Sequence, residues 1–120
     1  MGVPFWGSDV MTRAQAIEYC LSLPGVYEDY PFDAEWTAMR HSMSKKCFAF
    51  LFEREGRLFA NLKCEPMRAE FLREMYRGIT PAYHMNKVHW NSVYLDSDVL
   101  DDVVKTLLRD SYNLTSKKKR

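Results

Sequence analysis

Apolar residues recur at helical spacing in three segments of this 120-residue chain, and residues that begin or end helices stand at their boundaries. Thr12 and Gln15 form a capping box at the start of the first segment, and Pro24-Gly25 ends it. Pro66 suits the first turn of the second helix, and Gly78 suits its end. The pattern therefore predicts helices after Thr12 and from Pro66.

The third helix is predicted to begin at a cap formed by Asp96 or Ser97, because a side-chain oxygen there can accept from the first free N–H groups. Asp98, Asp101 and Asp102 then fall in its first turn, where negative charge is favourable. In the second helix, the spacing predicts a buried stripe of four apolar residues: Met67, Phe71, Leu72 and Met75.

The segments between the helices predict the strands of an antiparallel sheet. Residues 47–53 carry apolar side chains on both faces, three phenylalanines among them, which is typical of a central strand covered on both sides. The Glu55-Gly56 turn joins this strand to the next in a hairpin. We expect a loop at residues 26–35 and strands at 36–41, 47–53, 58–62, 83–85 and 89–95.

The predicted order of elements is α-βββ-α-ββ-α, which fits a two-layer α+β fold with an antiparallel sheet covered by helices. A chain of 120 residues suffices for one domain. We expect that domain to span residues 11–114, with an N-terminal extension at 1–10 and a basic tail at 115–120, both disordered.

No apolar run approaches the ~20 residues that a membrane helix needs, and residues 1–10 lack the features of a secretory signal. Cys20, Cys47 and Cys64 form no C-x-x-C pair, so the sequence supports neither a disulfide framework nor a zinc knuckle. We therefore expect a cytoplasmic protein with reduced thiols and no membrane partner; the sequence leaves the oligomeric state open, and we favour a monomer.

The net charge of +1 conceals an uneven distribution along the chain. Residues 1–35 carry six acidic side chains and one basic one, whereas residues 36–95 carry ten basic and five acidic ones. Residues 96–116 are acidic again, and the last four residues are all basic. The basic middle segment allows one basic face on a nearly neutral protein, and a mixed surface is the alternative.

Residues 81–95 hold the densest group of polar and aromatic side chains in the sequence. Lys87 is suited to a phosphate or another anion. His84 and His89 would lie on opposite faces of a continuous strand, and no adjacent carboxylate or thiol completes a shell, so we predict no metal and no cofactor. Alternatively, these residues have structural roles: a histidine imidazole accepts or donates a hydrogen bond, the Trp90 indole packs in the core, and the Asn86 side chain holds a turn together. The ligand-pocket candidates are Tyr83, His84, Asn86, His89 and Trp90.

Basic residues stand at both ends of the predicted central hairpin. Lys45 and Lys46 precede its first strand, and Arg54 and Arg57 flank its turn. These four side chains could contact a phosphate backbone. Lysines at strand ends also block edge-to-edge pairing, which is the structural alternative. With two further lysines added to these four, the set of predicted nucleic-acid-binding residues is Lys45, Lys46, Arg54, Arg57, Lys63 and Lys87.

The common catalytic motifs are missing from the sequence, which contains no G-x-S-x-G, no phosphate-cradling glycine loop and no H-E-x-x-H. A nucleophilic cysteine needs a histidine beside it, but Cys47 and Cys64 stand where buried strand residues are expected. We therefore expect a protein that is not an enzyme.

From about Met11 to Leu114 the chain resembles the MmcQ/YjbR family, and the most specific match is Tyr83-His84-Met85-Asn86-Lys87 with His89-Trp90. Further matches are Leu23-Pro24-Gly25, Asp29-Tyr30-Pro31-Phe32, Lys46-Cys47-Phe48-Ala49, Asn61-Leu62-Lys63-Cys64 with Pro66, and Ser111-Tyr112-Asn113-Leu114. The resemblance implies the same α-βββ-α-ββ-α fold, similar to that of secretion chaperones, and DNA binding through a pair of wing-like β-hairpins. The family usually has a glycine before the lysine of the second strand, where this chain has Ser44-Lys45-Lys46, and often one before the tyrosine, where it has Ala82. The loss of a turn glycine can alter the twist of a hairpin.

The leading hypothesis is a non-enzymatic DNA-binding protein that contacts phosphates through these basic residues. The similarity to secretion chaperones suggests a protein-interaction module instead, with a surface drawn from Phe5, Trp6, Tyr27, Tyr30, Phe32 and Trp36. A third hypothesis is a pocket for a small anionic ligand, formed around Tyr83, His84, Lys87, His89 and Trp90.

Overall fold

The computed structural model describes residues 10–116, and within them three helices and six strands follow one another. All neighbouring strands are antiparallel, in the order β1-β2-β3-β4-β6-β5. Most of the predicted N-terminal extension and basic tail lies outside the described residues. The elements are α2 (Arg13–Leu21), β1 (Val26–Asp29), β2 (Thr37–His41), β3 (Cys47–Arg54), β4 (Arg57–Lys63), α3 (Pro66–Met75), β5 (Ile79–Pro81), β6 (Trp90–Tyr94) and α4 (Asp101–Thr115).

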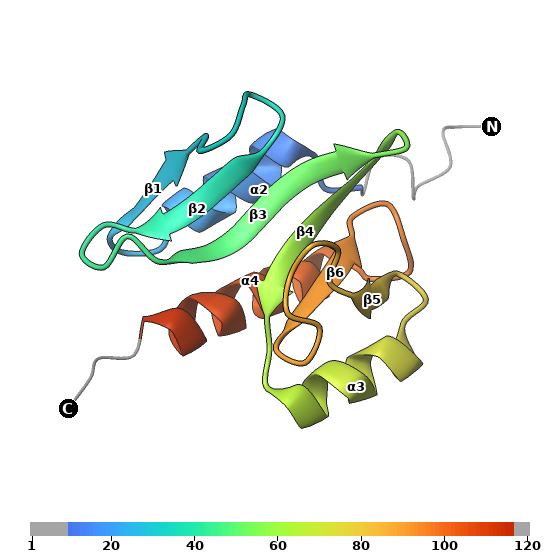
Figure 1. The fold of residues 1–120 in the computed structure, drawn as a ribbon. Helices are drawn as coiled ribbons and strands as arrows, with labels where there is room; N and C mark the ends of the chain where they lie inside the picture. The colour runs from blue at the N-terminus through green and yellow to red at the C-terminus, as the bar shows by residue number, and fades with distance from the viewer. Residues whose placement is uncertain (1–9, 117–120) are drawn as a thin grey trace.

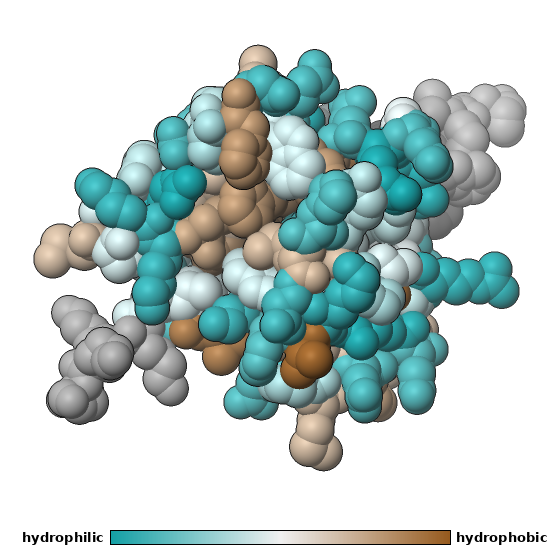
Figure 2. Space-filling model, viewed as in Figure 1, coloured by the Kyte–Doolittle hydropathy of each residue, from teal (hydrophilic) through white to brown (hydrophobic). Residues whose placement is uncertain are grey.

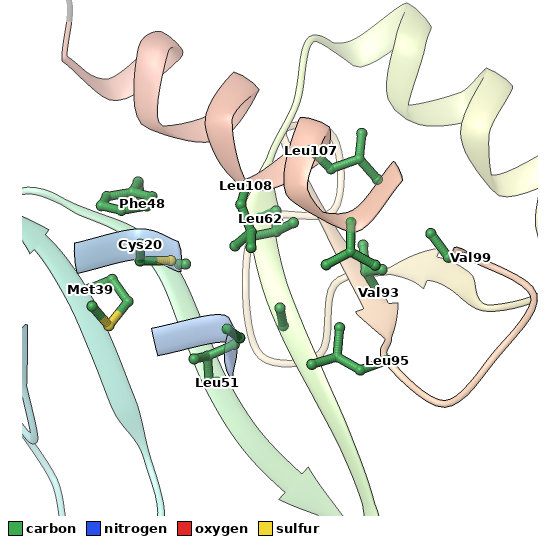
Figure 3. Packing of buried hydrophobic residues seen from close by; sticks show 14 of the residues in the cluster. Cys20, Met39, Phe48, Leu51, Leu62, Val93, Leu95, Val99, Leu107 and Leu108 are labelled. Atoms are coloured by element: carbon green, nitrogen blue, oxygen red, sulfur yellow. The ribbon is translucent and has the colours of Figure 1, made fainter. Parts of the chain in front are cut away.

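Two of the helices cover one face of the sheet. α2 packs against β1 and β2, α4 packs against β3 and β4, and α3 lies against β5 and β6 (Figure 1). Apolar side chains from both layers interlock between them, including Cys20 of α2, Met39 of β2 and Leu108 of α4 (Figure 3). The predicted α+β class with an antiparallel sheet is confirmed. No helix within residues 10–116 is long and apolar enough to cross a membrane.

The segment predicted as a loop at residues 26–35 contains a strand. Val26 pairs with His41 and Asp29 pairs with Ala38, so β1 forms one edge of the sheet. The strand has only four residues and two of them are acidic, so its sequence shows no apolar alternation. The order of elements is therefore α-ββββ-α-ββ-α, with one strand more than predicted.

The short strand predicted at residues 83–85 is displaced toward the N-terminus. β5 pairs with β6 through Ile79, which lies opposite Val93, whereas residues 83–85 form a turn. His84 has a φ of 64°, a left-handed conformation that a strand cannot contain. The backbone thus leaves the sheet four residues earlier than the sequence pattern indicated.

Helix α3 packs through a face that shares only Leu72 with the predicted one. Ala69 and Leu72 are its buried residues. Asn91 of β6 fixes the helix by donating to the Ala69 carbonyl at 3.3 Å and accepting from Arg73 Nε at 2.7 Å. These contacts turn the predicted apolar stripe toward solvent, and three of its members are 86%, 57% and 56% exposed: Met67, Phe71 and Met75.

Helix α4 begins later than predicted. Its N-cap residue is Leu100, which makes no side-chain capping bond. Asp98 instead accepts hydrogen bonds from the backbone N–H groups of Arg77, at 2.9 Å, and Gly78, at 2.8 Å. The acidic side chain that the sequence assigned to the helix therefore closes the turn that follows α3.

Candidate functional site

The face of the sheet that α2 and α4 leave uncovered is rich in aromatic rings. Because side chains alternate along a strand, the neighbours of the core residues Leu51 and Ala60 point to this side. Phe59 contacts both Phe52 and Tyr94 there, with ring centroids 4.1 and 4.9 Å apart. We call this side the open face, and its central residues are Phe50, Phe52, Phe59, Asn61, Ser92 and Tyr94.

The segment between β5 and β6 folds over part of the open face and is held there by a buried polar pair. Asn61 donates from Nδ2 to the carbonyl of Tyr83 at 2.9 Å, and the Tyr83 N–H donates to Ser92 Oγ at 3.0 Å. Ser92 Oγ in turn donates to Asn61 Oδ1. Two side chains of the sheet thereby fix both backbone groups of Tyr83.

Asn86 and Lys87 shape the same segment through their own hydrogen bonds. Asn86 Oδ1 accepts from the N–H groups of Val88, at 2.9 Å, and His89, at 3.1 Å, so this side chain ties the turn together. Lys87 Nζ donates to the carbonyl of Ala82 at 2.8 Å. Of the two possible roles for Asn86, the structure shows the structural one.

An aromatic cleft of about 420 Å³ lies beside this segment on the open face. Trp36 stacks on Phe52, with ring centroids 3.7 Å apart and planes 9° apart, and Phe32 meets Trp36 edge-on at 5.7 Å. Figure 2 views this face and shows apolar side chains gathered over the β2–β3 region with hydrophilic ones around them. The aromatic cleft is lined by Phe32, Trp36, Phe50, His84 and Met85.

His84 enters the cleft wall from a left-handed backbone position and packs against the neighbouring ring. Its imidazole lies 3.9 Å from the Tyr83 ring, centroid to centroid. Arg54 Cζ lies 4.1 Å from the centroid of the same Tyr83 ring, a cation–π contact. Arg54 thus contacts the residue that precedes His84, a member of the cleft lining. Within residues 10–116, no hydrogen bond uses the imidazole nitrogens of His84.

The register also sorts the charged strand residues between the two sides of the sheet. On the covered side the charged residues of the described strands are Glu28 and Glu53, both acidic. On the open face, Asp29 is the acidic one, and it pairs with Arg40 at 2.8 Å. Four basic strand residues point to the open face: Arg40, Arg54, Arg57 and Lys63.

Three of the basic residues predicted to bind nucleic acid differ in how free their side chains are to contact a ligand. Arg57 is paired with Asp96 at 2.8 Å and lies over the Tyr94 ring, and hydrogen bonding to Asp96 raises its pKa. Arg54 and Lys63 form no ion pair with any described residue. These two side chains are therefore the best placed on the open face to meet an anion.

The two lysines of the β2–β3 turn point to different sides of the sheet. Lys45 Nζ lies 5.6 Å from the Tyr27 ring, which is on the open-face side of β1. Lys46 lies near His41, where its charge adds to the effect of burial in lowering the pKa of that imidazole. Both lysines are at the opposite end of β3 from Arg54, so the predicted cations do not form one cluster.

His89 and Trp90 lie outside the aromatic cleft. The His89 side chain is exposed, and its carbonyl accepts from the Cys64 N–H at 2.8 Å. Trp90 is half-buried and pairs with Lys63 in the sheet. Within residues 10–116 no group of three or more His, Cys, Asp or Glu side chains could hold a metal ion.

The three thiols are free and poorly suited to nucleophilic attack. Burial raises the pKa of Cys20 to about 12 and that of Cys47 to about 11, and it also raises the pKa of Cys64. A thiol that stays protonated at neutral pH is a weak nucleophile.

The aromatic residues considered for a protein surface have two different environments. Phe32 and Trp36 line the aromatic cleft, whereas Tyr30 donates from its hydroxyl to Glu28 at the edge of the sheet. Two further members of that set lie outside the described residues: Phe5 and Trp6.

Phe50, Met85 and Arg40 belong to this region and were not assigned to it from the sequence. The alternation around Phe50 was visible, but it does not say which face the helices leave open. Arg40 is separated from the other cations in sequence, and only the pairing of β2 with β3 brings it to their side.

Comparisons with known proteins agree on a single family. The YjbR family model matches residues 21–114. The protein YjbR of Escherichia coli strain K12 is 34% identical over 114 residues, covering 92% of this chain and 95% of that protein. YyaQ of Bacillus subtilis strain 168 is 27% identical over 118 residues, covering 88% of this chain and 99% of that protein.

Two solved structures have the same fold. The crystal structure of Deinococcus radiodurans protein DR2400 has a TM-score of 0.81 and 33% identity, covering 92% of this chain and 82% of that one. The crystal structure of a Pseudomonas syringae protein has a TM-score of 0.79 and 31% identity, covering 88% of this chain and 99% of that one.

Proposed function

The chain belongs to the YjbR family, and we propose, as the sequence resemblance implies, that it binds nucleic acid through the open face of its sheet. The observation that carries this proposal is the sorting of charge by strand register. Basic strand residues outnumber the acidic one on the open face, and the charged strand residues of the covered side are acidic. A face of this kind attracts a phosphate backbone.

Arg54 and Lys63 are the proposed principal phosphate contacts, because neither forms an ion pair with a described residue. Lys45 would add a contact at the end of the sheet where β3 begins, and Lys87 would add one in the β5–β6 segment. Arg57 is held in an exposed pair with Asp96, a kind of pair that contributes about 0–1 kcal/mol and can be exchanged for phosphate. Lys46, on the α4 side, would contribute little.

The tip of the β3–β4 hairpin gives this face a projecting edge. Glu55 and Gly56 have φ values of 54° and 78°, and a two-residue turn with both φ angles positive matches the twist of the flanking strands. Arg54 and Arg57 stand directly on either side of this turn. We propose that this hairpin corresponds to one of the wings expected from the family.

We also propose that the protein is not an enzyme and that it is located in the cytoplasm. This proposal is supported by the three thiols, which remain free and whose pKa values are raised by burial. Free thiols are usual in a reducing compartment.

The test is the binding of labelled oligonucleotides, single-stranded and as a duplex, followed by fluorescence anisotropy between about 50 and 200 mM salt. The full chain is compared with a chain that ends at Ser116, so that the basic tail is removed. We expect binding that survives the truncation and weakens steeply with salt. Binding that disappears with the tail, or no binding of either form, would contradict the proposal.

A protein-interaction role is the second candidate, and the exposed stripe of α3 favours it. Met67, Phe71 and Met75 are four residues apart on one side of the helix and are at least 56% exposed. A contiguous apolar surface of this kind is common in binding sites for other proteins. Light scattering of the chain and of a Phe71→Ser variant tests self-association, and a mass equal to one chain at high concentration would exclude it.

A further inference from the structure

We propose that the aromatic cleft holds an unpaired nucleobase, so that the preferred ligand of this protein is a single strand. This inference rests on the proposed nucleic-acid binding and specifies its form. A base is a flat ring carried on a phosphate chain, and the open face offers an aromatic cleft beside basic side chains.

The walls of the cleft suit the face and edge of a flat ring. The Trp36 indole is half-buried and stacked on Phe52, so it forms a rigid wall, and Phe32 stands edge-on to it. Phe32 is 70% exposed, which leaves most of its ring free to contact a ligand. Stacking on aromatic side chains tolerates every base, because every base has a π face.

His84 provides a polar group at the edge of the same cleft. No described residue bonds to its imidazole nitrogens, and its position is fixed by the packing of its ring on Tyr83. The backbone of Tyr83 is in turn held by Asn61 and Ser92. A ring nitrogen at this place can donate to, or accept from, the edge of a base.

Basic side chains stand toward both ends of β3, the strand whose Phe50 lines the cleft. Arg54 contacts Tyr83, whose neighbour His84 lines the cleft, and Lys45 lies over Tyr27 at the other end of β2. A strand that places one base in the cleft can run along the open face toward either cation. In a duplex the base is stacked and paired, so it cannot enter the cleft without being extruded.

The test compares two labelled strands with equal numbers of phosphates, a thymidine oligonucleotide and an abasic strand of the same length. Anisotropy titrations use the full chain and the variants Phe32→Ala and His84→Asn, because asparagine tolerates the left-handed backbone of residue 84. Phe71→Ala, on the exposed stripe of α3, is the matched control. We expect the unaltered chain and the control to bind the thymidine strand about tenfold more tightly than the abasic strand.

Phe32→Ala should reduce that preference to about threefold or less and leave the affinity for the abasic strand unchanged. Equal binding of the two strands by the unaltered chain would overturn the cleft proposal while leaving phosphate binding intact. A preference that neither cleft variant reduces would also overturn it. Failure to bind either strand would overturn both this inference and the proposed function.

Discussion

The side-chain amide of Asn61 donates to the carbonyl of Tyr83, 22 residues further along the chain, at 2.9 Å. Asn61 is fully buried on β4, and Ser92 of β6 completes the group by bonding to both residues. This polar contact decides where the β5–β6 segment lies. Because His84 and Met85 of this segment line the aromatic cleft, the same contact also fixes the position of one cleft wall.

Replacing Asn61 by Ala should destabilise the fold and loosen this segment. The Tyr83 carbonyl would lose its donor, and a buried polar group left without a partner costs about 1–3 kcal/mol. Urea unfolding measures the loss, and amide exchange at residues 83–89 should accelerate. Ser42→Ala, at an exposed turn position, is the control and should change neither quantity.

Lys45→Gly should stabilise the protein although it removes a charge. Lys45 has a φ of 67° in the β2–β3 turn, a conformation that costs a non-glycine residue about 1–2 kcal/mol. Part of that gain is offset by the greater freedom of glycine in the unfolded chain, so we expect about 0.5–1 kcal/mol. Lys46→Gly removes the same charge without relieving a left-handed residue, and a similar gain there would refute this explanation.

Gly78→Ala should destabilise the protein by about 1–3 kcal/mol through overpacking. A Cβ at this position would lie 2.0 Å from Ser97 Oγ and 2.4 Å from Ser97 Cβ. The second substitution Ser97→Gly removes both atoms, so the double variant should recover part of the loss. A double variant that shows simple additivity in thermal unfolding would exclude this contact as the cause.

The stability of the fold should decrease as the pH falls below neutrality because of His41. Burial, assisted by the charge of Lys46, lowers the pKa of this imidazole from its usual 6.5, and its Nε2 lies 2.7 Å from Thr115 Oγ1. The unfolded chain therefore takes up the proton more readily, so stability is complete above pH 6.5 and is lost as the pH falls toward the folded-state pKa. Melting temperatures of His41→Gln between about pH 7 and pH 5 should show a smaller decrease than those of the unaltered chain.

Local signals in the sequence predicted local structure well. The capping box forms as expected, with Gln15 N–H donating to Thr12 Oγ1 at 3.1 Å and Gln15 Oε1 accepting from Thr12 N–H at 2.9 Å. The β3–β4 hairpin likewise turns at Glu55 and Gly56. Such features depend on a few adjacent residues, so a single sequence contains the information that they require.

Features set by contacts between distant segments were predicted less well. The exposed stripe of α3 has correct helical spacing, but Asn91 and Arg73 decide which side of the helix faces the sheet. The aromatic cleft joins Phe32 to His84, and only the sheet order brings these residues together. His84 was recognised from the sequence as a pocket candidate, whereas the walls opposite it were not.

The most direct test of the central claim compares charge removal on the two sides of the sheet. Arg54→Gln with Lys63→Gln removes the two strand cations of the open face that form no ion pair with a described residue, and Lys105→Gln with Arg109→Gln removes the same charge from the exposed side of α4. We predict that the open-face variant binds labelled single-stranded DNA more weakly and has a salt slope shallower by about two, whereas the α4 variant changes little. Equal losses for the two variants, or no loss for either, would contradict the assignment of nucleic-acid binding to the open face.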